Sequence, residues 1–190
     1  MTDTAASAAS RPVIRAPWLR WGLLALIQLV LISIPLIDRL QVQGSGQSVR
    51  LAVVPVDPRD LLRGDYVIIN LAIGQISKEV PGSDTVAYGD RVFVGLRASG
   101  DAPAEPVLVA RTREEAGDLA IAGTVLSVLD DEIRVDYGID AFFLPEGEGL
   151  EIERMDRSRI QLEVSVADDG RSLPVNLLMD GVVFRSDAIF

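Results

Sequence analysis

The stretch Trp21-Gly22-Leu23-Leu24-Ala25-Leu26-Ile27-Gln28-Leu29-Val30-Leu31-Ile32-Ser33-Ile34-Pro35-Leu36-Ile37 separates two parts of the chain with different physical character. Its 17 residues carry no charge, and Gln28 and Ser33 are its only polar side chains. This length lies near the lower limit for a helix that crosses a bilayer. A terminal helix that is apolar on every face does not suit a soluble protein, so we expect a transmembrane helix over residues 20–40.

The residues on either side of this stretch predict its orientation. Both tryptophans of the chain, Trp18 and Trp21, lie at its N-terminal end, where an interfacial aromatic anchor is expected. Three arginines precede the stretch, whereas Asp38 and Arg39 follow it and cancel. The excess of positive charge on the N-terminal side predicts a cytoplasmic N-terminus and a chain that lies outside the cytoplasm after about residue 40.

A cleaved secretory signal is the competing interpretation of the same stretch. Such signals have a shorter apolar core and end at a small-x-small site. Here Ile37 is followed directly by Asp38-Arg39-Leu40, and the nearest candidate site, Gly44-Ser45-Gly46, lies well beyond the core. The sequence favours an uncleaved signal anchor, which divides the chain into a cytoplasmic tail (1–19), a signal-anchor helix (20–40), a flexible linker (41–48) and an outer domain (49–190).

Composition excludes several classes of chemistry. The 190 residues include no Cys and no His, which removes disulfides, thiolate or imidazole metal sites and catalytic triads that use histidine. The net charge is −10, and because residues 1–40 carry four Arg against two Asp, the remaining 150 residues carry 14 basic and 26 acidic side chains. A domain with a net charge of −12 does not suit nucleic acid, whose binding depends on neutralising phosphates.

The outer domain shows the pattern of a mainly β fold. Short runs rich in β-branched residues recur between Gly, Pro and Asp, which predicts an antiparallel sandwich or barrel. The predicted strands are 49–56, 66–73, 92–97, 107–112, 119–129, 133–137, 160–166, 173–178 and 182–184, with Asp168-Asp169-Gly170 as a hairpin turn. One or two short helices are expected, over residues 57–62 and 149–157.

Two segments carry a resemblance to a known family. The first contains Gly64-Asp65-Tyr66 and resembles the motif of the GDYXXLXY family, although Ile69 stands where the motif has Leu and Leu71 where it has Tyr. The second, residues 135–149, is similar to a tyrosine-glycine stretch of that family which an aromatic residue and Pro-Glu-Gly follow. The resemblance implies a bacterial inner-membrane protein with one N-terminal helix, an outer domain and a multi-pass membrane protein as its partner.

The residues of these motifs are the candidate recognition site, and two interpretations of them stay open. In the first, Gly64 and Asp65 form a tight corner that is purely structural. In the second, the corner is a recognition patch in which an arginine grips a carboxylate or a phosphate. The candidate residues are Asp57, Arg59, Asp60, Arg63, Gly64, Asp65 and Tyr66, together with Tyr137, Pro145, Glu146 and Gly147.

No catalytic residue, metal site or cofactor is predicted. The acidic segments near residues 130 and 150 lack the D-x-D-x-D-G spacing of a calcium loop, so we interpret them as solvated loops. The favoured function is a non-catalytic interaction or assembly partner of an integral membrane protein. The alternative is an extracytoplasmic ligand-binding module or a carboxylate-based hydrolase that uses the corner at residues 57–66. An enzyme requires a pocket where carboxylates and arginines converge, whereas an interaction domain requires an exposed apolar patch.

Overall fold

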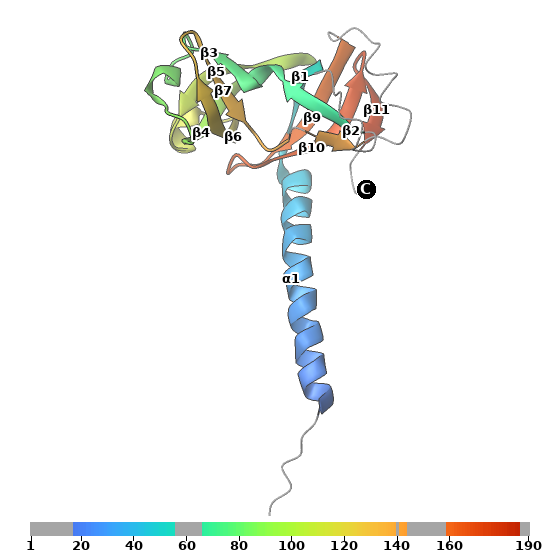
Figure 1. Cartoon of the computed structure of the whole chain (residues 1–190). Coiled ribbons are helices and arrows are strands. Elements are labelled where there is room, and N and C mark those ends of the chain that lie inside the picture. The colour runs from blue at the N-terminus through green and yellow to red at the C-terminus, as the bar shows by residue number, and fades with distance from the viewer. Residues whose placement is uncertain (1–16, 56–65, 140, 144–158, 187–190) are drawn as a thin grey trace, which may run out of the picture. The chain divides into compact units, whose positions relative to one another are not determined.

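The fold is mainly β, with one long N-terminal helix (Figure 1). The computed structural model describes residues 17–55, 66–139, 141–143 and 159–186. By compactness the chain divides into two units, residues 1–37 and residues 38–190. The expected fold class, an apolar N-terminal helix followed by an antiparallel β domain, is confirmed.

The helix α1 runs from Pro17 to Ser45. Within it, Trp21–Ser45 is a candidate membrane span by length and composition, a test that a signal sequence near the N-terminus also passes. The large apolar side chains of Trp18 and of residues 21–37 are exposed. A helix with no polar face gains nothing from water, which is the physical reason to expect it in lipid.

The β domain consists of two antiparallel sheets. The six-stranded sheet has the order β11-β10-β9-β1-β2-β8, and the five-stranded sheet has the order β3-β7-β6-β4-β5. The strands are β1 (Gln47–Pro55), β2 (Tyr66–Leu71), β3 (Gln75–Ser77), β4 (Arg91–Ser99), β5 (Ala102–Ala110), β6 (Ala120–Val128), β7 (Glu132–Asp136), β8 (Ala141–Phe143), β9 (Ile160–Val166), β10 (Ser172–Met179) and β11 (Val182–Ser186).

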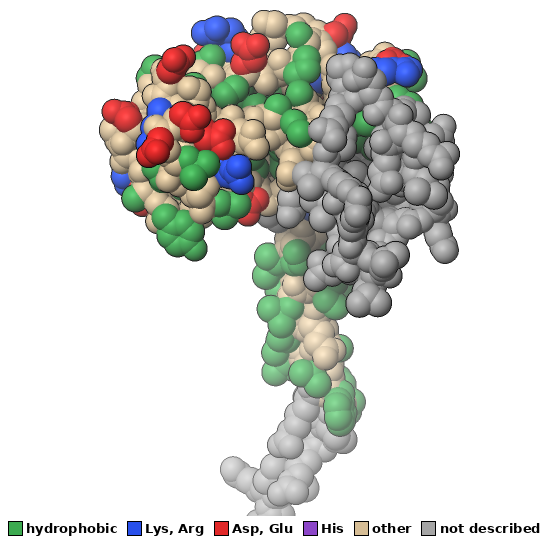
Figure 2. Space-filling model, turned by 45° about the horizontal axis from the view of Figure 1, so that its top comes forward, with side chains coloured by type: hydrophobic (Ala, Val, Ile, Leu, Met, Phe, Trp, Pro, Cys, Tyr) green, Lys and Arg blue, Asp and Glu red, His purple; other side chains and the backbone are tan. Residues whose placement is uncertain are grey.

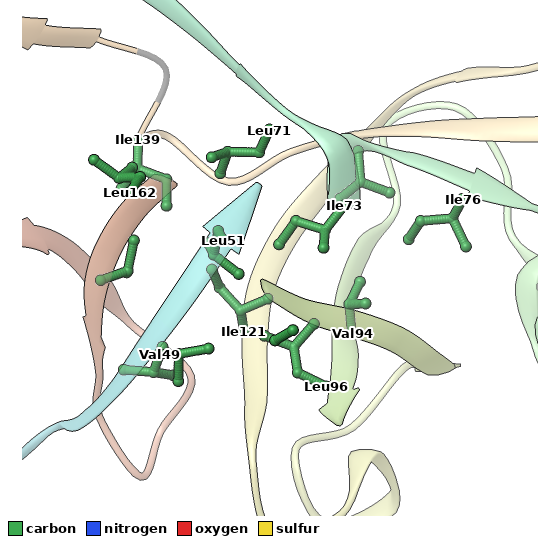
Figure 3. Close-up of a cluster of buried hydrophobic side chains, with 14 of the residues drawn as sticks. Val49, Leu51, Leu71, Ile73, Ile76, Val94, Leu96, Ile121, Ile139 and Leu162 are labelled. Carbon is green, nitrogen blue, oxygen red and sulfur yellow. The ribbon is translucent and has the colours of Figure 1, made fainter. Parts of the chain in front are cut away.

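One hydrophobic core joins the two sheets (Figure 3). Alternate residues of β1, including Val49 and Leu51, pack in the same cluster as Val94 of β4 and Ile121 of β6. Each fully buried aliphatic side chain contributes about 1.5–3 kcal/mol relative to an exposed one. The alternation of buried and exposed residues along β7 is the period of two that the sequence pattern predicts.

The predicted strands agree with the observed ones to within two residues at each end, except that β5 begins at Ala102 and not at residue 107. The other exceptions are short elements. Strands β3 and β8 have three residues each, too few to show alternation, and were not predicted. Within the part of the chain that the structure describes, three short 3₁₀ turns were also not predicted: η1 (Ala72–Gly74), η2 (Ser83–Thr85) and η3 (Glu114–Ala116). The expected helical turns at 57–62 and 149–157 lie outside the described residues.

Two hairpin turns follow the local sequence. The predicted turn Asp168-Asp169-Gly170 connects β9 to β10, with Gly170 at a φ of 87° and the Asp169 carboxylate accepting a hydrogen bond from the Arg171 N–H at 3.0 Å. Between β10 and β11, Asp180 and Gly181 have φ values of 52° and 77°. Two consecutive residues with positive φ match the twist of a two-residue hairpin, which explains the Asp-Gly pair there.

The segment expected to be a flexible linker, residues 41–48, is instead a packed junction. Helix α1 continues to Ser45 and β1 begins at Gln47. The Val42 side chain is 2% exposed, and the Ser165 hydroxyl of β9 donates a hydrogen bond to the Val42 carbonyl at 2.6 Å. The same carbonyl also accepts a hydrogen bond from the Gly46 N–H at 3.1 Å, so the Ser165 hydroxyl adds a second, buried bond at the helix end.

Gly46 is required at this junction for space. A Cβ atom built on Gly46 would lie 2.1 Å from the Ser165 hydroxyl oxygen and 2.5 Å from the Val42 carbonyl oxygen. Both distances are far below van der Waals contact. Gly44, two residues earlier in α1, has no atom within 4 Å of the same position. The glycines that suggest flexibility in the sequence therefore have different roles.

Substituting each glycine by alanine tests the packed junction. We expect Gly46→Ala to lower the free energy of unfolding by about 1–3 kcal/mol, because the new methyl group overpacks the contact with Ser165. Gly44→Ala is the matched control and should be neutral or stabilising by up to about 1 kcal/mol, because alanine favours the helix. Thermal melting of the full chain in mild detergent measures both. Equal effects of the two substitutions would indicate a flexible linker after all.

Candidate functional site

A surface cleft of about 310 Å³ lies beside the core, where residues of both sheets meet. The first sheet contributes the ends of β1 and β2, and the second contributes β3, β6 and β7. The lining residues are Val54, Asn70, Leu71, Gly74, Gln75, Leu126, Arg134, Val135, Asp136, Tyr137 and Ile139. This volume is at the lower end of the range for ligand sites in proteins.

The apolar lining of the cleft has a buried part and an exposed part. Leu71, Val135 and Ile139 are each 8% exposed or less and belong to the core. Val54 and Leu126, in contrast, are 41% and 54% exposed. The cleft therefore has a floor that is continuous with the core and two accessible aliphatic side chains.

Leu126 is exposed because the side chains of β6 alternate: Ile121, Gly123 and Val125 are buried, whereas Thr124 and Leu126 face outward, and a β-bulge follows at this point. In the pairing of β6 with β7, Val125 is opposite Val135 and Ser127 is opposite Arg134, so that Leu126 is the extra residue of β6. Bulges redirect side chains and occur often beside functional sites. The bulge changes the register of β6 only from Leu126 onward, where Ser127 is half-buried and Val128 is exposed.

Tyr137 connects the two sheets at this place. Its hydroxyl donates a hydrogen bond to the Ile73 carbonyl at 2.7 Å, and Ile73 lies in η1, just after β2. Burial raises the pKa of the Tyr137 hydroxyl far above its ordinary value, so the group stays protonated and acts as a donor. The predicted site residue Tyr137 is therefore a structural tie in a wall of the cleft.

The charged groups of the cleft are engaged by their own neighbours. The Asp136 carboxylate accepts a hydrogen bond from the Gly138 N–H at 2.8 Å, and Gly138 has a φ of 69°. The Arg134 guanidinium lies 3.3 Å from the Glu132 carboxylate on the same strand. The Asp136 carboxylate thus stabilises a turn, and Arg134 belongs to a surface ion pair.

The fold brings the two sequence motifs side by side. Strand β2, which begins at Tyr66, pairs with β8, and the backbone of Tyr66 is opposite that of Phe143. Leu71, which stands where the family motif has its second Tyr, is in the floor of the cleft. Motifs separated by some 70 residues in the chain are thus neighbours around one cleft.

The structure describes two of the eleven predicted recognition residues. Tyr66 is the first residue of β2 and Tyr137 lies beside the cleft. The other candidates lie outside the described residues: Asp57, Arg59, Asp60, Arg63, Gly64, Asp65, Pro145, Glu146 and Gly147.

A second Gly-Asp pair in the chain does form a turn before a strand. Gly89 has a φ of 83°, and the Asp90 carboxylate accepts a hydrogen bond from the Ala87 N–H at 3.0 Å. Strand β4 begins at the next residue, Arg91. Residues 88–90 therefore form a turn that opens a strand.

Sequence reasoning missed most of the cleft. Asn70, Gln75 and Leu126 were not candidates, because each is an ordinary strand residue until the sheets are assembled. The bulge at Leu126 has no marker such as Gly or Pro beside it in the sequence. Among the described residues, no three acidic side chains gather as they would around a metal ion.

Replacing Tyr137 by Phe tests its role as a structural tie. We expect a loss of about 1–2 kcal/mol in the free energy of unfolding, because the Ile73 carbonyl loses its donor. Above pH about 10 an unfolded tyrosine ionises while Tyr137 keeps its proton, so the wild-type chain should lose stability there as pH rises.

Tyr137→Phe should lack that alkaline loss, whereas Tyr88→Phe, at a side chain 79% exposed, should keep it and cost little. Urea unfolding of the full chain in detergent, followed by circular dichroism at neutral and alkaline pH, measures the difference. An unchanged alkaline loss in Tyr137→Phe would contradict the assignment.

Comparison with known proteins supports the family resemblance that the two motifs carry. No curated protein and no solved structure matches the chain. The family model described as GDYXXLXY protein matches residues 28–177, which include most of α1, both motifs and the strands from β1 to β9. On this match the chain belongs to the GDYXXLXY family.

Proposed function

We propose that this protein is a membrane-anchored extracytoplasmic domain that acts, without catalysis, as an interaction or assembly partner of an integral membrane protein. Residues 20–40 hold it in the inner membrane of a bacterium, with the N-terminus in the cytoplasm and the β domain outside. The partner is a multi-pass membrane protein, and nucleic acid is not a partner.

One observation carries this proposal: the cleft has exposed aliphatic side chains while its charged groups are already engaged. Val54 and Leu126 are accessible, whereas Asp136 is bonded within a turn and Arg134 is paired with Glu132. A catalytic site would instead require free carboxylates that converge on one point. Accessible apolar side chains beside a recess are what a protein interface uses.

The charges around α1 support the orientation. Arg11, Arg15 and Arg20 precede the apolar span, and the domain after it carries a net charge of −12. Positive residues are retained on the cytoplasmic side during insertion. An acidic domain outside also remains soluble and is repelled by anionic lipid.

Reporter fusions test the orientation. A reporter that is active only outside the cytoplasm should be active when fused after Phe190, and a cytoplasmic reporter at the same place should be silent, because the positive N-terminal flank stays inside. The size of the mature chain is the control for cleavage. The reverse reporter result, or loss of the first 40 residues, would contradict a signal anchor.

Purification from native membranes in mild detergent tests the partner. An integral membrane protein should co-purify with the tagged chain in a constant ratio, and an unrelated single-pass protein with the same tag serves as background. If the corner at residues 57–66 recognises this partner, Arg63→Gln should abolish co-purification without changing the melting temperature. Absence of any membrane protein above background would overturn the proposed function.

A further inference from the structure

The lining of the cleft suggests what kind of partner it receives. Val54 of β1 and the bulged Leu126 of β6 are accessible aliphatic side chains of the same recess. Leu71, Val135 and Ile139 complete an apolar surface beneath it. A recess of about 310 Å³ with this lining suits one large apolar side chain, which is how anchor residues dock at protein interfaces.

Two carboxamides line the same cleft. Asn70 of β2 and Gln75 of β3 are both exposed, and neither side chain forms a hydrogen bond with any other residue that the structure describes. A carboxamide offers one acceptor and two donors, which match the N–H and C=O groups of an extended peptide. The polar part of the lining thus favours a polypeptide backbone over a purely apolar ligand.

The charge beside the cleft is mainly negative. Glu132, Arg134 and Asp136 alternate with the buried residues of β7 and so share its outward face. Asp130 and Asp131 precede them in the β6–β7 turn. Lys78 lies beside this turn, where its backbone N–H bonds to the Asp131 carbonyl, so four carboxylates stand against Arg134 and Lys78. Figure 2 shows acidic side chains gathered over the part of the domain that the five-stranded sheet forms. A binding segment with basic residues complements this rim.

We infer that the cleft binds an extended segment of the partner protein, with one large apolar side chain inserted between Val54 and Leu126 and a Lys or Arg on each side of it facing the β6–β7 hairpin. The inference rests on the proposed function and adds to it the place and the chemistry of the contact.

A second copy of this chain is a poorer occupant of the cleft. Residues 41–190 carry a net charge of −12, so two copies brought together at an acidic rim repel each other. The charge therefore favours a different, basic chain.

Binding of defined peptides to the full chain tests the inference. The chain is placed in nanodiscs of neutral phosphatidylcholine, and the probe is the fluorescein-labelled peptide Ser-Lys-Thr-Phe-Thr-Lys-Ser, followed by fluorescence anisotropy. One twin replaces Phe by Ser, and another replaces both Lys by Glu. We expect the Phe probe to bind about tenfold more tightly than its Ser twin, and the Glu twin to show no binding. Empty nanodiscs give the background.

Variants of the cleft assign the binding to its residues. Leu126→Ser should remove most of the difference between the Phe probe and the Ser twin, and Val54→Ser should act in the same direction. The matched control is Val128→Ser, on the same strand and 41% exposed, which does not line the cleft and should leave the ratio unchanged. An unchanged melting temperature shows that each variant is folded.

The charged rim has its own pair of variants. Asp136→Asn keeps an oxygen that can accept from the Gly138 N–H, and it should weaken binding of both basic probes by a few fold. Glu105→Gln, an exposed change on β5 away from the cleft, is the control and should have no effect.

Three results would overturn the inference: equal binding of the Phe probe and its Ser twin, an unchanged ratio in Leu126→Ser, or displacement of the probe by spermine as readily as by unlabelled peptide. Co-purification of a membrane protein that survives Leu126→Ser would leave the proposed function standing and place the contact elsewhere. Peptide binding without any co-purifying membrane protein would support the cleft as a peptide site and overturn the proposed function.

Discussion

The shared core of the two sheets is the constraint on which the rest of the β domain depends. Without cysteine the domain has no disulfide, so hydrophobic packing, aided by hydrogen bonds such as that from Tyr137 to Ile73, must hold the sheets together. Strand β1 pairs with β9 on one side and with β2 on the other, and its inward residues pack against the second sheet. Both neighbouring strands are thereby positioned by residues such as Val49 and Leu51, which contribute to one hydrophobic cluster.

The cleft is a consequence of how the two sheets meet. At the end of β2 the chain turns through η1 into β3, which belongs to the other sheet, so the core reaches the surface between them. Tyr137 bonds to the carbonyl of Ile73 at this crossing, and the exposed Leu126 of β6 lines the cleft beside it. The family's two motifs frame this crossing, which gives their occurrence in one chain a structural reason.

The junction at Gly46 joins the last turn of α1 to strand β9. The Ser165 hydroxyl of β9 donates a hydrogen bond to the Val42 carbonyl near the end of α1. Gly46 alone separates α1 from β1. The last turn of α1 therefore packs against the β domain.

The sequence by itself determined the elements and their chemistry. Period-two patterns placed the longer strands, the uncharged stretch at 21–37 placed the helix, and Gly64-Asp65-Tyr66 pointed to the family. Local signals sufficed there because hydrophobic periodicity and turn residues act over a few neighbours.

Only the tertiary structure decided which of these elements meet. The pairing of β2 with β8, the bond from Tyr137 to Ile73 and the contact of Gly46 with Ser165 join residues about 65 to 120 positions apart in the chain. The glycine-rich segment at 43–48 looked flexible because composition reports backbone freedom and not the space around a Cβ atom. The bulge at Leu126 was equally hidden, because register depends on the partner strand that β6 pairs with.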